Sequence, residues 1–271
     1  LNAPRPYNEV CRAKTVIKTG FIENPNTDIF NIYCDLAKSI SGFKLSTFSL
    51  FDENEQCSIA NSGDKNFKQG TRSPRDKFNI CTYVLLNHEP LIITDIWKDP
   101  NWKTHPKVLD KTGIRGYAGF PIINKDNFAL GTLCLQNPEP LKISKKNIEL
   151  MKKITSNISL LLDTRIEQKE ATAEKFLKTL STFSKSYNKL TISDLECFFM
   201  KICEIDFNND LAKNLISEGL LRKEQNGNIV FSPKGEQIKK SLDLQTKQIK
   251  RVKFRGNKAN VILDEMLSEI R

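Results

Sequence analysis

The sequence is poor in the residues on which metal centres and many enzyme active sites depend. It contains two histidines, His88 and His105, and its seven cysteines include no C-x-x-C pair. Zinc sites use clustered cysteine and histidine ligands, so we expect no metal and no cofactor. An odd number of scattered cysteines also differs from the disulfide framework of a small secreted protein. We expect most of these thiols to behave as small buried hydrophobes.

Long apolar runs are missing as well. No stretch approaches the ~18 consecutive apolar residues that a membrane-spanning helix needs. Residues 1–4 lack the basic patch and the apolar segment that open a secretory leader. A composition of 39% hydrophobic and 27% charged residues is typical of a globular protein. We therefore expect a cytoplasmic protein without a membrane partner, and 271 residues are enough for two domains.

The net charge of +10 is concentrated in one segment. Residues 1–164 hold 22 basic and 17 acidic side chains, and residues 165–271 hold 20 and 15, so each half carries +5. Within the second half, residues 234–258 alone hold nine basic and two acidic side chains. The rest of that half is therefore slightly acidic. This distribution predicts a local basic patch and not a basic coat.

The first half of the chain alternates helical and strand patterns. Apolar residues recur at helical spacing over 27–41, with Thr27 as the expected N-cap and Gly42 as the stop. A short helix is expected near 75–87. Strand patterns occur at 44–51, 55–62, 91–94, 117–124 and 128–136. This order predicts an α+β fold with mainly antiparallel pairing.

Four blocks of this half resemble the core of a GAF domain. Between residues 74 and 135 they read P-R-D-K-F-N-I-C-T-Y-V-L-L-N-H-E-P-L-I-I-T-D, D-P-N-W-K-T-H-P, G-I-R-G-Y-A-G-F-P-I-I-N and A-L-G-T-L-C-L. The resemblance covers about 20–165. It implies a central antiparallel sheet with helices on one face and a ligand cavity between the other face and its loops. GAF modules usually sense or dimerise and then pass a signal to another domain.

The ligand classes best known for this family fit the sequence poorly. Members that bind cyclic nucleotides follow the sheet with an Asn-Lys pair and then F-x-x-x-D-E, whereas here Pro138 follows Asn137 and the later motif reads I-S-K-K-N-I. Members that bind a bilin attach it through a cysteine next to a histidine, and this sequence has no such pair.

An apolar or mixed pocket for a small molecule remains. The residues that fall where family members line their pocket are Phe48, Cys81, Trp97, Trp102, Ile114, Arg115, Tyr117 and Phe120. Among them, Arg115 is a candidate clamp for an anionic group. The alternative is that the aromatic rings simply fill the cavity. The GAF domain would then be structural or would serve for dimerisation.

An enzymatic alternative for this fold is thiol-dependent reduction of methionine sulfoxide. That reaction needs a nucleophilic thiolate and a resolving cysteine in one pocket, and Cys81 and Cys134 could approach each other across the sheet. The cysteine motifs of such family members are absent, however, and Leu133 and Leu135 beside Cys134 indicate packing in the core. We therefore predict no catalytic residue and expect that the protein is not an enzyme.

A long helix is predicted after residue 144. Apolar residues recur there every three, four or seven positions to about residue 187, and no proline or glycine interrupts them. Such a helix of about 44 residues would be ~65 Å long. GAF domains commonly dimerise through a helix of this kind, so we expect a homodimer. The alternative is a pair of ordinary helices, each packed within its own domain.

The same region lacks the residues of the usual catalytic outputs. No histidine follows His105, which excludes the phospho-accepting helix of a histidine kinase. No Gly-rich nucleotide loop, G-G-D-E-F string or His-Asp pair is present either.

The second half resembles a winged helix-turn-helix domain over about 190–245. Two helical segments, T-I-S-D-L-E-C-F-F-M-K-I-C-E and N-N-D-L-A-K-N-L-I-S-E-G-L-L, precede an N-G hairpin and a helix that opens with S-P-K-G. In this family the second helix enters the major groove of DNA and the wing contacts phosphates. The candidate DNA contacts, including those of the basic tail, are Asn208, Asn209, Lys213, Asn214, Arg222, Lys223, Lys234, Lys250, Arg251, Lys253 and Arg255.

Charges near the second helix leave open whether the winged helix binds DNA or protein. Asp206 and Asp210 lie in its first turn, where DNA phosphates would repel them, so the winged helix could bind a protein instead. The basic stretch at 246–258 favours nucleic acid because it interleaves cations with apolar residues; a solvated helix face is the alternative. Residues 259–270 are expected to form a short amphipathic helix that docks on a partner subunit.

These patterns predict four segments. They are a GAF-like sensory domain at 1–143, a connecting and dimerisation helix at 144–189, a winged-helix-like domain at 190–246, and a basic tail with a short helix at 247–271. The predicted function is a non-catalytic transcriptional regulator in which the GAF domain controls DNA binding. A protein-binding adaptor and a sulfoxide reductase are the alternatives.

Overall fold

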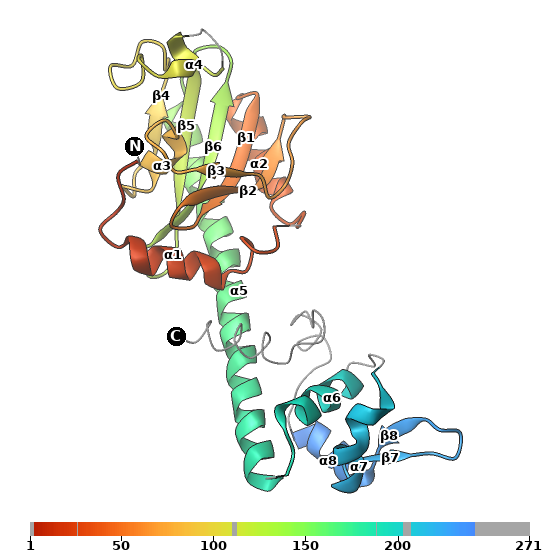
Figure 1. Cartoon of the computed structure of the whole chain (residues 1–271). Coiled ribbons are helices and arrows are strands. Elements are labelled where there is room, and N and C mark those ends of the chain that lie inside the picture. Colours follow the sequence, from red (N-terminus) through yellow and green to blue (C-terminus); the bar gives the residue numbers. More distant parts are fainter. Residues whose placement is uncertain (1–2, 26, 110–112, 188, 203–206, 242–271) are drawn as a thin grey trace. The chain divides into compact units, whose positions relative to one another are not determined.

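The structure is a computed structural model and describes residues 3–25, 27–109, 113–187, 189–202 and 207–241. The chain divides into two compact units, 1–166 and 167–271 (Figure 1). The boundary falls inside the helix that was predicted as the connector. No helix among the described residues is both long and apolar enough to span a bilayer.

The first unit is built on a six-stranded antiparallel sheet in the order β3-β2-β1-β6-β5-β4. Its strands are β1 (Leu45–Phe51), β2 (Glu55–Ser62), β3 (Arg72–Pro74), β4 (Leu91–Ile93), β5 (Gly116–Ile123) and β6 (Ala129–Asn137). The five predicted strands are confirmed to within one residue at each end. The short edge strand β3 was missed because three residues are too few to show an alternating pattern.

Five helices belong wholly or partly to this unit. They are α1 (Glu9–Lys18), α2 (Asn31–Ser41), α3 (Ile80–Val84), α4 (Pro106–Leu109) and α5 (Lys145–Ser186). Gly42 ends α2 in the left-handed conformation, with φ of 77°, as a helix stop requires. The prediction of Thr27 as N-cap is wrong, because α2 begins only after Phe30. A turn formed by the bond from the Asn31 amide to the Asp28 carbonyl precedes it.

The sheet carries a different layer on each face (Figure 1). Helices α2 and α5 cover one face, where Cys34 and Ala37 of α2 pack with strand side chains. Helix α5 adds an apolar stripe at helical spacing to that core: Met151, Ile154, Ile158 and Leu162. A separate apolar cluster, which includes Val84 of α3 and Ile93 of β4, lies on the other face.

Buried charges join α1 to the sheet. The side chains of Arg12 and Arg75 are fully buried, and their guanidinium groups lie 2.7 and 2.5 Å from the same oxygen of Glu9. Arg12 also donates to the carbonyl of Phe51 at 2.7 Å, and Arg75 to that of Asp52 at 2.5 Å. Buried charges are tolerated only when they are paired in this way. Helix α1 was not predicted because Arg12 lies on its buried face and breaks the apolar stripe.

The second unit is mainly helical and contains a small hairpin. Its elements after α5 are α6 (Ile192–Ile202), the 3-10 helix η1 (Asn209–Ala212), α7 (Lys213–Ser217), β7 (Leu221–Lys223), β8 (Ile229–Phe231) and α8 (Pro233–Ser241). The predicted N-G hairpin is present, with Gly227 at φ of 87° in its turn. The predicted end of the last helix near 249 and the short helix at 259–270 lie outside the described residues.

Helix α5 contributes to both units. It is one helix of 42 residues, as the uninterrupted pattern predicted. Its first part packs on the sheet, whereas Phe183 near its end belongs to the apolar core of the second unit. There the Phe183 ring lies 5.3 Å from that of Phe198 on α6. The last turns of α5 therefore serve as the first helix of the second unit.

We predict that Glu9→Gln destabilises the first unit by about 3–5 kcal/mol at pH 7, because it leaves two buried arginines without their anion. Urea unfolding of the full chain, followed by circular dichroism, measures the change. Glu23→Gln removes an exposed carboxylate from the same unit and serves as the matched control, with an expected effect within about 0.5 kcal/mol.

The effect should depend on pH. Burial alone would raise the pKa of Glu9, but hydrogen bonds from Arg12 and Arg75 hold it below its ordinary value. The stabilisation is therefore fully present above the unfolded-state pKa, about 4.3. It is lost as the pH falls through the lower folded-state pKa. An equal difference between the wild type and Glu9→Gln at pH 7 and at pH 3 would contradict this account.

Candidate functional site

The eight residues predicted to line a ligand pocket are divided between the two faces of the sheet. Phe48 and Phe120 are fully buried on the face that α2 and α5 cover, and the Phe48 ring lies 4.7 Å from that of Phe30. Tyr117 is three residues before Phe120 on β5 and so points to the opposite face. The structure therefore places Phe48 and Phe120 in the helix-covered core, away from the other six.

Arg115, the predicted anion clamp, already holds a carboxylate of the protein. Its Nη2 and Nε atoms lie 2.6 and 3.1 Å from the two oxygens of Asp95, and its guanidinium stacks over the ring of Trp97 at 4.7 Å. The hydrogen bond from Arg115 lowers the pKa of Asp95. A ligand anion at Arg115 would therefore have to compete with a bidentate ion pair.

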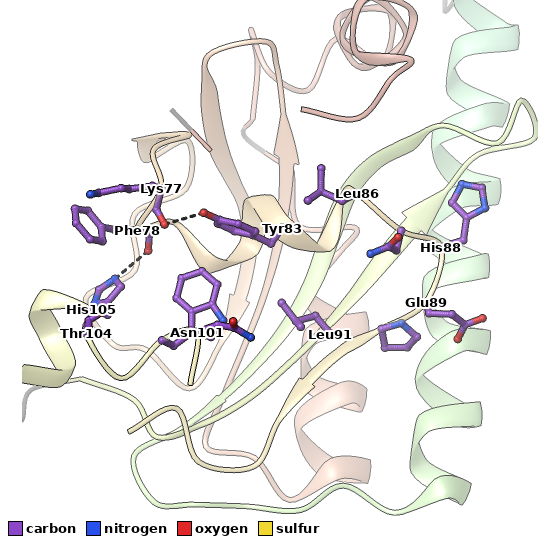
Figure 2. A pocket seen from close by; sticks show the side chains of 13 residues that line it. Lys77, Phe78, Tyr83, Leu86, His88, Glu89, Leu91, Asn101, Thr104 and His105 are labelled. Carbon is purple, nitrogen blue, oxygen red and sulfur yellow. Dashed lines mark hydrogen bonds between the residues drawn. The ribbon is translucent and has the colours of Figure 1, made fainter. Parts of the chain in front are cut away.

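A hollow of about 870 Å³ opens beside α3 on the face of the sheet away from α5's apolar stripe. Of the eight predicted residues, Trp102 lines it. Both histidines of the chain do so too: Figure 2 shows His105 with Phe78 at one end and His88 with Glu89 at the other. Neither histidine was predicted as a site residue, although each lies in one of the motifs P-R-D-K-F-N-I-C-T-Y-V-L-L-N-H and D-P-N-W-K-T-H-P.

Aromatic side chains and satisfied polar atoms line this hollow. The Tyr83 ring meets that of Trp102 edge-on at 5.0 Å, and the Tyr83 hydroxyl donates to the Lys77 carbonyl at 3.1 Å. At one end, Nε2 of His105 lies 3.0 Å from the Phe78 carbonyl. The volume and the mixture of rings and polar groups suit a small organic molecule.

Two cysteine thiols meet beneath α3. The Sγ atoms of Cys81 on α3 and Cys134 on β6 lie 3.2 Å apart. The Tyr117 hydroxyl lies 3.4 Å from the first sulfur and 3.1 Å from the second, and Thr132 Oγ1 lies 3.1 Å from Cys134 Sγ. These residues form the thiol cluster. The expected approach of Cys81 and Cys134 across the sheet is thus present in the structure.

A glycine makes this approach possible. Gly119 on β5 pairs in register with Cys134. A Cβ atom at position 119 would lie 2.5 Å from both the Tyr117 hydroxyl and a methyl group of Val84 on α3. Helix α3 can therefore pack directly on the sheet only because residue 119 has no side chain.

The thiol cluster polarises one sulfur more than the other. The hydrogen bond to Cys134, together with burial, raises the pKa of Cys81, and burial raises that of Tyr117. Burial also opposes ionisation of Cys134, yet its hydrogen bonds with Cys81, Thr132 and Tyr117 bring its pKa below the ordinary value. Of the two sulfurs, Cys134 therefore has more partners that can stabilise a thiolate. No group of three or more His, Cys, Asp or Glu side chains in the described part of the chain could hold a metal ion.

In the second unit, three of the four predicted base-reading residues have partners within the protein. Asn214 donates to the buried carboxylate of Asp194 at 3.3 Å, and Lys213 pairs with Asp210 at 2.8 Å. The Asn208 side chain caps η1 by accepting the Asp210 amide at 3.0 Å. Asn209 begins η1 and is exposed. The role of Asp194 was missed because it depends on a contact between two helices.

Some of the predicted wing and tail residues lie in the described part of the chain, and others do not. Arg222 and Lys223 lie exposed on β7. Lys234 on α8 donates to the Glu218 carbonyl at 3.0 Å and lies 4.7 Å over the Tyr187 ring. The remaining candidates lie outside the described residues: Lys250, Arg251, Lys253 and Arg255.

Comparisons with known proteins agree on the first unit. The GAF domain family matches residues 26–162. A cyclic di-GMP phosphodiesterase of Pseudomonas aeruginosa is 29% identical over 137 residues, which are 51% of this chain and 22% of that protein. The chain thus spans about a fifth of that relative's length.

Two solved structures are similar in fold. One is the GAF domain of an Acinetobacter phosphoenolpyruvate-protein phosphotransferase, with 14% identity, a TM-score of 0.43, and coverage of 59% of this chain and 95% of that one. The other is the blue-light-absorbing form of the Thermosynechococcus elongatus PixJ GAF domain, with 15% identity, a TM-score of 0.41, and coverage of 69% and 99%.

We predict that iodoacetamide modifies Cys81 and Cys134 at least about tenfold more slowly than the exposed Cys11 in the native protein, because both are buried. Iodoacetamide labelling at timed intervals, followed by peptide mass spectrometry, measures the three rates. In Gly119→Ala, the new methyl group should displace α3 and accelerate labelling of Cys81. Native rates equal to those in guanidinium would contradict the burial of the pair.

Proposed function

Because the chain belongs to the GAF domain family, we propose that its first unit is a sensory module that regulates the second unit, a winged-helix domain that binds DNA. The observation that carries the proposal is α5, which packs in the cores of both units. An α-helix without proline or glycine is stiff. A ligand that shifts α5 against the sheet would therefore also move the helices that pack on Phe183.

We propose further that the regulator acts as a homodimer through the outer sides of α2 and α5. Ile32 and Leu36 are 60 and 44% exposed on one face of α2, Ile29 just before α2 is 52% exposed, and Leu160 on α5 is 63% exposed. The Asn147 side chain on α5 donates to the Ile40 carbonyl at 2.9 Å, so the end of α2 lies beside the start of α5. A second copy would bury this apolar surface.

DNA binding is supported by the order of elements and by the cations of the hairpin. The last turns of α5, then α6, then η1 with α7, the hairpin and α8 follow the order of a winged-helix domain. Arg222 and Lys223 make no ion pair with any other described residue. They lie where a wing meets the phosphate backbone.

One observation favours an adaptor that binds protein instead. Asn214 and Lys213 are held by Asp194 and Asp210, so α7 has few free side chains for base edges. Asp210 is 70% exposed and would repel phosphates. An exposed carboxylate on η1 beside a helix α7 whose side chains already have partners is better suited to a basic protein surface.

Fluorescence anisotropy of the full chain on duplex DNA tests the two alternatives. We expect the affinity to fall steeply between about 50 and 200 mM salt, because binding releases counterions. The double variant Arg222→Ala, Lys223→Ala should weaken binding and reduce the slope of log affinity against log salt by about one for each lost contact.

The matched control is Lys65→Ala, Lys68→Ala, which removes the same charge from an exposed loop of the first unit and should leave the slope unchanged. Weak binding that is insensitive to salt would contradict the DNA proposal. Recovery of a protein partner from nuclease-treated extract, lost in Asp210→Ala, would then support the adaptor.

A further inference from the structure

The thiol cluster has the geometry of a disulfide that has not yet formed. Its two sulfurs come from separate elements 53 residues apart in sequence and lie 3.2 Å from each other. A disulfide bond is about 2.05 Å long, so oxidation needs an approach of little more than 1 Å. Cys81 is 6% exposed and Cys134 2%, so the pair is buried and only a small oxidant can reach it.

We propose that Cys81 and Cys134 are a redox couple, which a small hydroperoxide converts into a disulfide within the first unit. Cys134 is the attacking thiol because Tyr117, Thr132 and Cys81 all lie within hydrogen-bonding distance of its sulfur. Once Cys134 has lost its proton, the Tyr117 and Thr132 hydroxyls can donate to its sulfur and stabilise the thiolate, which is the nucleophile. Cys81 is the resolving thiol.

The chemistry balances with hydrogen peroxide as the oxidant. The Cys134 thiolate attacks one peroxide oxygen, the O–O bond breaks, and the departing hydroxide takes up the proton that Cys134 released, forming water. Cys81 then attacks the sulfenic sulfur, the S–S bond forms, and the S–O bond breaks. The second hydroxide leaves with the Cys81 proton as water. Two thiols are oxidised, and one peroxide is reduced to two water molecules.

Other described cysteines lack these features. Burial raises the pKa of Cys34 to about 12 and that of Cys197 to about 11. Neither has a second sulfur within hydrogen-bonding distance among the residues that the structure covers. Cys11 is exposed and equally without such a neighbour. Selective oxidation of the couple therefore follows from proximity and from the donors around Cys134.

Oxidation of the couple would also affect the shape of the hollow beside α3. A bond between Cys81 and Cys134 would draw α3 toward β6 and fix it there. Tyr83 is two residues from Cys81 on the same helix, and its ring packs on Trp102 in the wall of the hollow. The redox state of the couple would thereby change the shape of the site in which a small molecule would bind.

Mass spectrometry of the full chain tests the couple. The reduced protein is treated with a slight excess of hydrogen peroxide, quenched and digested without reductant. We expect a peptide pair joined through Cys81 and Cys134, lighter by two hydrogens and separated by dithiothreitol. In Cys81→Ser, dimedone should trap a sulfenic acid on Cys134, whereas in Cys134→Ser no such adduct should form on Cys81.

The rate of oxidation tests whether the Tyr117 hydroxyl activates Cys134 or whether the two sulfurs react only because they are close. Tyr117→Phe should slow disulfide formation by about tenfold, the effect of losing one hydrogen bond to a charged group. Tyr33→Phe removes the same hydroxyl from α2, which packs on the opposite face of the sheet, and should leave the rate unchanged. Circular dichroism confirms that each variant is folded.

Three outcomes would overturn the proposal. The first is absence of the linked peptide after peroxide has fully oxidised an equal concentration of glutathione. The second is linkage of Cys81 or Cys134 mainly to other cysteines. The third is turnover of free methionine sulfoxide with dithiothreitol at a rate above that of peroxide, which would assign the couple to sulfoxide reduction instead.

Discussion

The apolar stripe of α5, formed by Met151, Ile154, Ile158 and Leu162, packs against one face of the sheet of the first unit. Each such side chain contributes about 1.5–3 kcal/mol when it is fully buried. The stripe completes the core on that face and closes it to ligands. The same helix continues into the second unit, where its residue Phe183 belongs to the apolar core.

The hollow and the thiol cluster both lie on the opposite face of the sheet. Gly119 allows α3 to pack directly on the strands, and this packing brings Cys81 to Cys134 and places Tyr83 against Trp102. The hollow and the thiol cluster thus lie on two sides of the short helix α3. A ligand in the hollow and a bond between the sulfurs would act on the same element, α3, and through it on the sheet that α5 covers.

Much of the fold could be predicted because the strands are short apolar runs between turn residues and the long helix has no interruption. Helix α1 could not, because its buried face carries Arg12, which is stable there only with Glu9 and the carbonyl of Phe51. That pairing depends on residues far away in sequence.

The candidate site could be predicted only in part. The approach of Cys81 and Cys134 was expected from the sheet, whereas Phe48 and Phe120 were assigned to the pocket by resemblance and lie on the other face. Strand parity would have separated Phe120 from Tyr117. The hollow lined by His88 and His105 depends on how two loops fold over α3. No local sequence pattern predicts this arrangement of the loops.

Under the proposed function, α5 sets the second units of a homodimer in phase, so that both engage one DNA duplex. Insertion of alanines after Glu170 tests it, since each residue turns an α-helix by about 100°. Two inserted residues would place the second units nearly opposite their original direction, whereas seven would restore it within about 20°.

We expect the two-residue insertion to weaken DNA binding at least about tenfold, because the two second units of the dimer no longer bind one duplex together. The seven-residue insertion should recover most of the affinity. Equal affinity for both insertions and the wild type, measured by anisotropy at one salt concentration, would contradict coupling through α5.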